Sequence, residues 1–328
     1  ALGIGPLQFM RRLEEDLGKH LADIGDAFAG TSTGSIAVVG LCNGMSADEL
    51  YNLYEDNLSA IFTKVSAARV VTNNYYRYNN AKLKKLLQTN FKKCMYEFKK
   101  PMFIPVTFMN GKSVEKVWDR GDGMTEQWFA VLSSCSAPTY FDTVSRTKNG
   151  KKEIYCDGGM WANDPIMVLE SGLNNVKEFK GNYRILSFNT RMDRPNSAPK
   201  DKSVLGWGKY ILDEWIARTG NSGYYEACAN IGKENVFRIA PPVEEKYPMD
   251  DVSLIGEISN IWDEYYDEVK KELLKFLKLL YLPPLRKFHH NLQIWGTVLH
   301  FYQTPLEHTV PPHKTLRVCV IILFPLLQ

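Results

Sequence analysis

The chain contains 328 residues, 45% of them hydrophobic and 23% charged, with a formal net charge of +3. These values exclude wholesale disorder, and so small a net charge gives no indication of nucleic-acid binding. The six cysteines include no CxxC pair, so neither a zinc site nor a disulfide framework is predicted, and a reducing, cytoplasmic compartment fits best.

Hydrophobic periodicity predicts alternating helices and strands through residue 282. The first helix has apolar residues at three- and four-residue steps, and a short apolar strand then leads to Gly30. In chain order, the pattern predicts a helix over 7–21, a strand over 24–29, helices over 33–43, 46–62 and 81–90, strands over 102–109 and 114–118, a helix over 125–135, a strand over 153–156, a helix from Asp164-Pro165, a strand over 183–189, a helix over 205–218, a strand over 236–240 and a long helix over 253–280.

This alternation predicts an α/β domain in residues 1–282, with a mostly parallel central sheet. Residues 283–328 differ in composition, because prolines interrupt the pattern and Glu307 is the only acid. No pair of histidines at helical spacing accompanies a carboxylate, so a metal site is not predicted. This segment is interpreted as a Pro/His-rich, irregular tail, and it holds five of the six histidines: His289, His290, His300, His308 and His313.

The stretch Gly30-Thr31-Ser32-Thr33-Gly34 has the spacing of a nucleophile elbow. An apolar strand precedes it and an apolar helix follows, which is the context that the elbow needs. The amides at the start of that helix favour the oxyanion that forms after attack. Because a serine hydroxyl is a poor nucleophile on its own, Ser32 needs a neighbouring base.

Histidine is scarce where a base is needed. Ser32, Asp157 and His289 follow the chain order of an α/β-hydrolase triad. That fold requires several strands before its nucleophile, however, and only 29 residues precede Gly30. No histidine lies between His20 and His289, so an imidazole base requires the tail to fold back into the site.

A carboxylate is the other candidate base. Asp157 ends a predicted strand and is followed by Gly158 and Gly159, which allow another backbone to approach closely. Partial burial raises the pKa of such a carboxyl toward the range that suits a base. An Asp-Gly turn without any catalytic role explains the same residues.

Four stretches resemble motifs of the patatin-like phospholipases, in that family's order. Gly30 to Gly34 resembles its GTSTG elbow, Ser136 to Phe141 its SAAPTYF segment, Asp157-Gly158-Gly159 with Asn163-Asp164-Pro165 its DGG-x-x-x-N-x-P element, and Ala1 to Pro6 the end of its DGGG-x-[RK]-G loop. The resemblance covers residues 1–190 well and fades through residue 240.

The resemblance implies a three-layer α/β/α fold and hydrolysis of fatty-acyl esters of membrane phospholipids, with no metal or organic cofactor. It implies a dyad in which Ser32 attacks the ester and Asp157 takes the proton. The glycine loop, represented by Gly3, and the Thr33 N–H would bind the oxyanion. Gly30 and Gly34 would shape the elbow, and the residues around the base would be Gly158, Gly159 and Asn163.

The sequence departs from the family pattern at its start. Leu2 stands where the family has a basic residue, and the chain begins after the loop's three glycines and the strand before them. Loss of one oxyanion donor lowers turnover by about 100- to 1,000-fold. We therefore expect a fragment or variant of poor activity, with an unpaired sheet edge. Two alternatives stay open: a catalytically impaired lipid-binding or scaffold protein, and an acyltransferase.

Several residues are candidates for lipid contact. The expected partners are an acyl-lipid substrate and, transiently, the surface of a membrane. For the lysines named below, a solvated helix face is an equally good explanation. Arg191 and Asp193 follow a predicted strand and are candidates for the pocket border. Candidates for an acyl groove are Trp207, Tyr210, Trp215, Tyr224 and Tyr225, and candidates for anionic head groups are Lys84, Lys85, Lys92, Lys93, Lys99 and Lys100.

Overall fold

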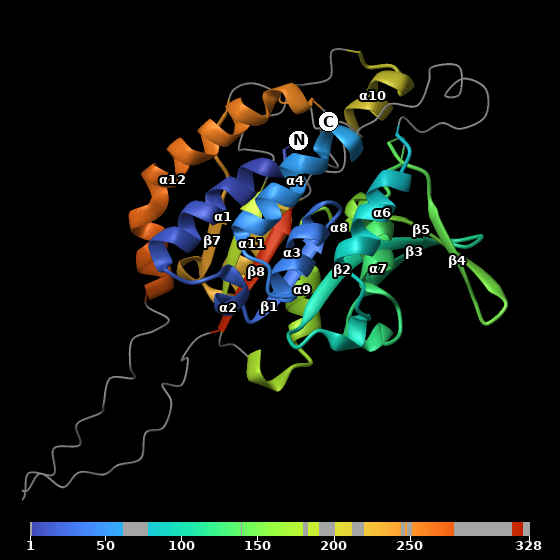
Figure 1. Ribbon diagram of the computed structural model, residues 1–328, viewed down its shortest axis with the longest axis horizontal. Coiled ribbons are helices and arrows are strands. Elements are labelled where there is room, and N and C mark those ends of the chain that lie inside the picture. Colours follow the sequence, from blue (N-terminus) through green and yellow to red (C-terminus); the bar gives the residue numbers. More distant parts are fainter. Residues whose placement is uncertain are drawn as a thin grey trace, which may run out of the picture.

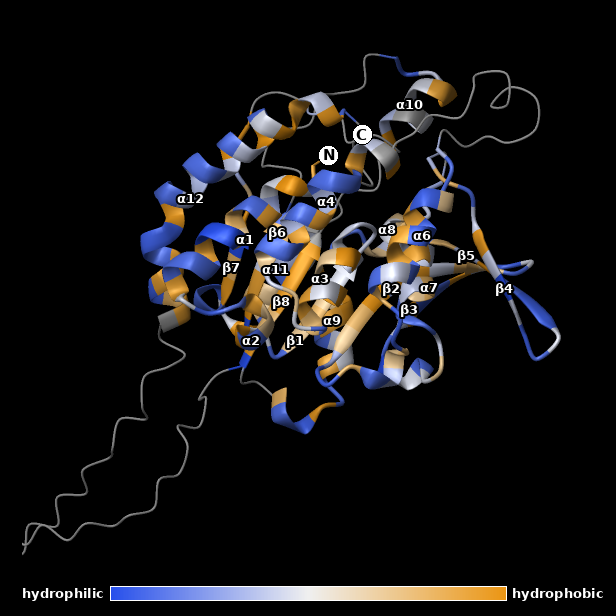
Figure 2. Cartoon of the chain, viewed as in Figure 1, coloured by the Kyte–Doolittle hydropathy of each residue, from blue (hydrophilic) through white to orange (hydrophobic). Residues whose placement is uncertain are grey.

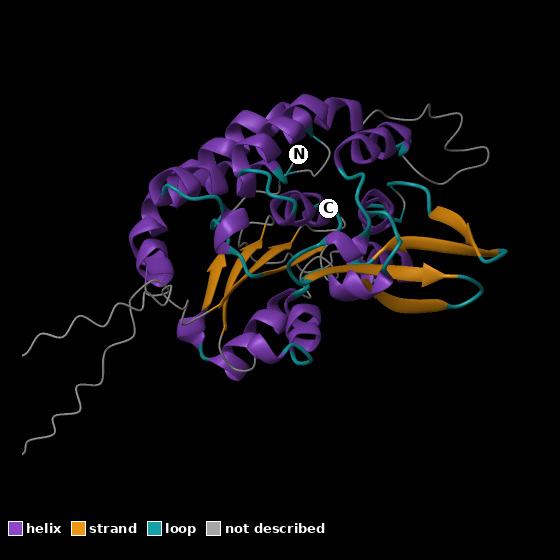
Figure 3. Cartoon of the chain, turned by 60° about the horizontal axis from the view of Figure 1, so that its bottom comes forward, coloured by secondary structure: helices purple, strands orange, loops and turns teal. Residues whose placement is uncertain are grey.

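The computed structural model describes residues 2–61, 78–138, 140–179, 183–189, 201–211, 220–243, 247, 251–278 and 317–323. Helices cover both faces of a twisted sheet, and a group of antiparallel strands projects from one end of it (Figures 1 and 3). The predicted three-layer α/β/α fold is confirmed.

The described strands form one sheet of eight, in the order β4-β5-β2-β1-β8-β6-β7, with β3 paired to β2. The strands β2, β1, β8, β6 and β7 run parallel, whereas β3, β5 and β4 are joined through antiparallel pairs. The bounds are β1 Ala27–Thr31, β2 Met102–Met109, β3 Ser113–Trp118, β4 Val144–Lys148, β5 Lys151–Asp157, β6 Tyr183–Asn189, β7 Val236–Ile239 and β8 Arg317–Leu323.

Two layers of helices enclose this sheet. One face carries α3 against β1 and β8, with α1, α4 and α12 packed outside it, and α9 and α11 cover the other face. The bounds are α1 Ile4–Leu17, α2 Leu21–Ile24, α3 Gly34–Cys42, α4 Ala47–Ile61, α6 Ala81–Asn90, α7 Gln127–Ser134, α8 Gly159–Ala162, α9 Ile166–Leu173, α10 Val204–Tyr210, α11 Gly220–Ile231 and α12 Ile255–Lys278.

The parallel strands are apolar on both faces, as expected of strands buried between two helical layers. Along β8, Val318, Val320 and Ile322 join the core under α3, whereas Cys319 and Ile321 join the core under α9 and α11. Figure 2 shows this apolar centre, with hydrophilic residues on the outward sides of α1 and α12.

The start of the chain differs from the prediction. The predicted helix over 7–21 is two helices, because Gly18 adopts a left-handed φ of 60° and ends α1. The predicted strand over 24–29 begins only at Ala27, since Ile24 belongs to α2. Apolar spacing alone did not mark the glycine at which the first helix stops.

Most later elements lie where they were predicted, including α3, α4, α6, β2, β3, α7, β6, β7 and α12. Ser46 and Glu49 form the expected capping box: the Glu49 N–H donates to the Ser46 hydroxyl, and the Ser46 N–H donates to the Glu49 carboxylate. Of the helix predicted over 205–218, the structure describes α10 and Ile211, and the other predicted residues lie outside the described part.

Several described elements were missed, among them the strand β4 and the helix α11. The strand β4 forms a hairpin with β5 through Asn149 and Gly150, whose φ angles of 51° and 73° fit a tight turn of the primed type. The helix α11 was also missed, because its Gly-Asn-Ser-Gly start reads as a loop.

The strand β8 comes from the predicted tail. It lies between β1 and β6 and is parallel to both, so β1 is paired on one side with β2 and on the other with β8. The sequence predicted an unpaired sheet edge where a preceding strand is missing; β1 has no unpaired edge, because β2 and β8 pair with its two sides. Among the described helices, none combines the length and apolar character needed to cross a bilayer.

Candidate active site

The elbow at Ser32 has a demanding local geometry. Ser32 joins β1 to α3 with a φ of 54°, a conformation that residues other than glycine rarely adopt. A Cβ atom at Gly30 would lie 2.5 Å from Val38 Cγ2 and 2.6 Å from the Gly34 carbonyl oxygen, so the turn requires glycine there. These features are those of a strand–turn–helix nucleophile elbow.

Hydrogen bonds hold the strained residue in place. The Ser32 N–H donates to Ser134 Oγ at 3.0 Å, and that hydroxyl donates to the Pro105 carbonyl at 2.8 Å. The Ser32 carbonyl accepts from the Ser35 hydroxyl at 2.6 Å and from the Cys135 thiol at 3.2 Å. The Ser32 N–H is therefore committed to the scaffold.

Asp157 lies at the end of β5, opposite Val106 in β2. Its own N–H donates to the Ser136 carbonyl at 3.0 Å, within the predicted Ser136–Phe141 segment. A Cβ at Gly158 would lie 2.3 Å from the Pro105 carbonyl oxygen, so only glycine allows this approach. The Gly159 N–H donates to Asp157 Oδ1 at 2.8 Å and orients the carboxyl.

The fold brings Ser32 and Asp157 together. The Thr31 hydroxyl donates to the Ala162 carbonyl at 2.7 Å, which fastens the end of β1 to α8, directly after Asp157. The Ser32 hydroxyl is close enough to the Asp157 carboxyl to stabilise its ionised form by hydrogen bonding. Asp157 Oδ2 nevertheless has no partner at normal hydrogen-bond geometry within the described residues, so this contact is a loose one.

Burial controls the ionisation of this pair. Asp157 is fully buried, and burial raises the pKa of its carboxyl to about 8 from an ordinary value of 3.8. Hydrogen bonds from the Ser32 hydroxyl and the Gly159 N–H act in the opposite direction and favour the carboxylate. A carboxyl with this pKa can take and return a proton near neutral pH, which an ordinary aspartate cannot do efficiently.

The described surroundings of Ser32 contain no imidazole. His20 is the one histidine among the described residues; it precedes β1, at the end of the strand opposite Ser32, and its Nδ1 lies 3.0 Å from Glu14 Oε2. His289 and the other tail histidines lie outside the described residues.

The remaining predicted site residues differ in position. Thr33 is the N-cap of α3, Gly34 is the first residue of that helix, and no hydrogen bond among the described residues uses the Thr33 N–H. Asn163 is fully buried at the end of α8. Gly3 is the N-cap of α1, and no hydrogen bond within the described part of the chain links it to Ser32.

Two supporting groups were missed from sequence. Ser134 gave no signal, because a serine inside an apolar helix looks like a surface residue until its partners are known. Arg238 in β7 donates through Nη1 to Asp164 Oδ2 and to Ser187 Oγ, both at 2.7 Å. Asp164 directly follows Asn163, so this buried ion pair ties the segment after Asp157 to β6 and β7.

An apolar cavity of about 30 Å³ adjoins Thr33, the neighbour of Ser32. It lies between α3, α4 and α6, not among the aromatic residues predicted for an acyl groove. Of those, Trp207 and Tyr210 pack together in α10, and Tyr224 and Tyr225 in α11. Trp215, Arg191 and Asp193 lie outside the described residues. The lining residues are Thr33, Ile36, Leu53, Tyr54, Leu58, Ile61, Leu83, Leu86 and Phe141.

Comparison with known proteins identifies the family of the chain. The chain is 27% identical over 186 residues to a cGAMP-activated phospholipase of Pseudomonas aeruginosa, covering 54% of each chain. It is 25% identical over 316 residues to an intracellular phospholipase A2 of Caenorhabditis elegans, covering 84% of this chain and 28% of that relative. The chain thus spans about half or less of the curated relatives that it matches. Since the family model for patatin-like phospholipase matches residues 1–170, the chain belongs to the patatin-like phospholipase family.

Proposed function

We propose that the protein is a lipid acyl hydrolase that cleaves fatty-acyl esters of membrane lipids through Ser32 and Asp157. The observation that carries this proposal is the placement of a strained serine against a fully buried carboxyl whose pKa is raised to about 8. Membership of a phospholipase family supports the choice of an acyl ester as substrate.

The reaction has two halves. Ser32 Oγ attacks the ester carbonyl carbon while its proton passes to the Asp157 carboxylate. The tetrahedral intermediate then collapses, the bond to the leaving oxygen breaks, and the leaving alcohol or lysolipid takes the proton from Asp157. In the second half, water gives a proton to Asp157 and attacks the acyl-enzyme, which releases the fatty acid and returns the proton to Ser32.

The oxyanion requires donors that the scaffold has not already used. The Thr33 N–H is the nearest such donor, and it lies at the positive end of the nine-residue helix α3. The Ser32 N–H is bonded to Ser134, so it is not a second donor in this arrangement. By family resemblance, the backbone at Gly3 is proposed to supply the other contact.

The acyl chain is proposed to enter the apolar cavity beside Thr33. In its wall, the Tyr54 hydroxyl already donates to the Thr33 carbonyl at 2.6 Å, so this hydroxyl is not left unsatisfied against a hydrocarbon chain. A free volume of about 30 Å³ holds only a small part of a fatty acyl chain. Binding therefore requires side chains such as Leu58 and Leu86 to move apart.

Contact with a membrane is proposed at α10. Val204 and Leu205 are 90% and 86% exposed, and Trp207 is exposed beside them. Figure 1 shows α10 beyond the end toward which β8 points, the end that carries Ser32. Exposed leucine and tryptophan next to a lysine, Lys202, are typical of a segment that rests on a bilayer surface.

Charge insertion tests that contact. Leu205→Asp should weaken cosedimentation with phosphatidylcholine–phosphatidylglycerol vesicles without changing hydrolysis of a soluble short-chain ester. Val114→Asp, at an exposed apolar position on β3, is the matched control. Equal loss of vesicle binding in both variants would place the contact elsewhere.

Labelling and product analysis test the catalytic proposal. Ser32→Ala should abolish both labelling by a serine-reactive phosphonate and release of fatty acid from mixed liposomes, measured by mass spectrometry. Asp157→Asn should abolish turnover and keep the fold, whereas Ser145→Ala, at an exposed serine on β4, should change neither. Turnover that survives in Ser32→Ala would overturn the proposal.

One observation favours an alternative without turnover. With the Ser32 N–H committed to Ser134, the described residues show few free donors for an oxyanion. In that case the wild-type protein would release no fatty acid, and Ser32→Ala would keep the wild-type affinity for vesicles. Acyl transfer to an acceptor other than water would instead appear as an acylated second product.

A further inference from the structure

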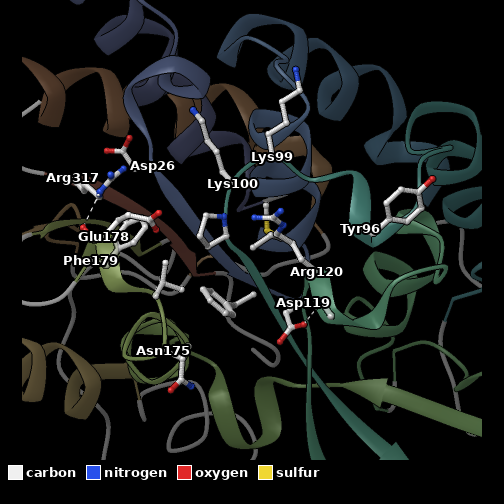
Figure 4. Close-up of a pocket in the computed structure, with 16 residues that line it drawn as sticks. Asp26, Tyr96, Lys99, Lys100, Asp119, Arg120, Asn175, Glu178, Phe179 and Arg317 are labelled. Carbon is white, nitrogen blue, oxygen red and sulfur yellow. Dashed lines mark hydrogen bonds between the residues drawn. The ribbon is translucent and has the colours of Figure 1, made fainter. Parts of the chain in front are cut away.

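A second, larger cavity opens at the end of the sheet where β1, β2 and β8 begin, opposite the end that carries Ser32. It encloses about 880 Å³, which lies within the usual range of sites for small organic ligands. Residues before β1, at the start of β2 and at the start of β8 line it, together with the segment after α9 and the short helix Arg120–Asp122. Figure 4 shows Arg120 reaching toward the middle of the cavity, with Tyr96 to one side and Arg317 and Glu178 to the other.

This cavity is separate from the catalytic pair. Asp26 precedes β1, whereas Ser32 follows it, so the full length of the strand lies between them. Five residues of a strand span about 17 Å. A molecule in the cavity therefore contacts neither Ser32 nor Asp157.

Several basic side chains line its walls, and two of them are not engaged by any other described residue. Lys100 donates to the carbonyls of Ala22 and Gly25, and Arg317 donates to the Glu178 carbonyl and lies 5.1 Å from the Phe179 ring centre. Within the described residues, the Lys99 ammonium and the Arg120 guanidinium have no hydrogen bond or ion pair.

Two of the acidic side chains on the walls already accept hydrogen bonds from backbone amides. Asp26 accepts from the Val318 N–H at 2.8 Å, and Asp119 accepts from the Gly121 N–H at 2.6 Å. The Glu178 carboxylate and the Asn175 amide have no hydrogen-bond partner among the described residues. The cavity thus has an unpaired cationic side at Arg120 and an unpaired accepting side at Glu178, which suits a ligand with an anionic end and a donor-bearing end.

The floor between those sides is apolar. Pro101, Met102 and Phe103 from the start of β2 form it, with Phe179 opposite. Gly172 has no side chain, and a Cβ there would lie 2.2 Å from the Phe103 ring, so glycine allows α9 to pack closely against that ring. A cavity of this size with an apolar floor fits an organic body better than a free inorganic ion.

We propose that this cavity binds a small soluble organic phosphate, with its phosphate at Arg120 and a hydrogen-bonding organic body reaching toward Asn175 and Glu178. The exposed Lys99 side chain points away from Arg120 in Figure 4 and would turn toward the bound phosphate. A planar guanidinium matches the geometry of phosphate oxygens. A phospholipid head group shares the phosphate chemistry. A lipid head group is the less suitable source of the phosphate, because a bilayer that presents a substrate to Ser32 meets the opposite ends of the strands.

Calorimetric titration of the full chain with AMP tests the site at constant salt. Saturable binding is expected, with adenosine at least tenfold weaker because it lacks the phosphate. Arg120→Glu and, separately, Lys99→Glu should weaken AMP binding by about tenfold or more, since each removes a charge-assisted hydrogen bond. Both side chains are exposed, so the melting temperature of each variant should match that of wild type.

Matched variants decide what the titration means. Lys92→Glu makes the same charge change on an exposed lysine outside the cavity and should bind AMP as wild type does. Ser32→Ala should also bind normally, so failure of the catalytic proposal leaves this one standing. Three results would overturn the proposal: no AMP binding at millimolar concentration, equal loss in Lys92→Glu, or anionic vesicles whose binding depends on Arg120 but is not displaced by AMP.

Discussion

At the scale of single residues, the catalytic proposal depends on the ionisation of Asp157. The carboxyl must be ionised before it can accept the Ser32 proton, and burial raises its pKa to about 8. For a soluble short-chain ester, kcat/KM should therefore rise about tenfold per pH unit up to pH 8 and level off above it. A rising limb near pH 6.5, the ordinary pKa of histidine, would instead indicate an imidazole base.

The same carboxyl affects stability. Its folded pKa of about 8 exceeds the ordinary 3.8, so between these values the folded protein holds a proton that the unfolded chain has released. The free energy of unfolding then falls as pH rises through this window, by up to about 1.4 kcal/mol per unit. Asp157→Asn removes this contribution, so urea denaturation should show the variant gaining on wild type between pH 5 and pH 8. An unchanged difference would mean that Asp157 is not protonated in the folded state.

At the scale of elements, the segment carrying Asp157 is fastened by the Asp164–Arg238 ion pair. Side-chain exposures of 2% and 12% make this a buried pair, and losing one partner of such a pair costs about 3–5 kcal/mol. Arg238→Met should therefore lower the free energy of unfolding strongly, and adding Asp164→Asn should restore much of it. Lys270→Met, which breaks an exposed pair with Asp267, is the control.

A conservative variant of Arg238 distinguishes a role in positioning Asp157 from a role in stability alone. If Arg238 holds the Asp157 segment in place, Arg238→Lys should lower kcat while KM stays near its wild-type value. A variant in which only stability falls, with kcat per folded molecule unchanged, would give Arg238 a purely structural role.

Local signals predicted the elements that periodicity and caps define. The capping box at Ser46 and the apolar alternation of β6 gave correct elements because nearest neighbours along the chain determine them. Ser134 and Arg238 were not predictable in the same way, since their partners lie between 29 and 102 residues away in sequence. The motif around Ser32 and Asp157 was recognisable because glycines at Gly30 and Gly158 leave a sequence trace of close backbone contacts.

At the scale of the whole molecule, the strand β8 shows what sequence order conceals. Its run of valine, isoleucine and leucine is that of a buried strand, but a segment nearly 300 residues after β1 gives no local sign that it pairs with it. The tail was interpreted as irregular because its composition is unusual, and one part of it stands at the centre of the sheet.

That central place makes β8 a test of the whole fold. With β2 and β8 on its two sides, the amides of β1 should exchange with solvent only through global unfolding. Ile321 is fully buried in β8, so Ile321→Ala should cost about 2–5 kcal/mol and speed exchange in β1 and β6 together. Val114→Ala on the outer strand β3 removes a similar side chain from an exposed position and should leave that exchange unchanged. Rapid exchange of β1 amides in the wild-type protein, measured by mass spectrometry, would show that β8 does not hold this position in solution, because an unpaired neighbour leaves those amides open to water.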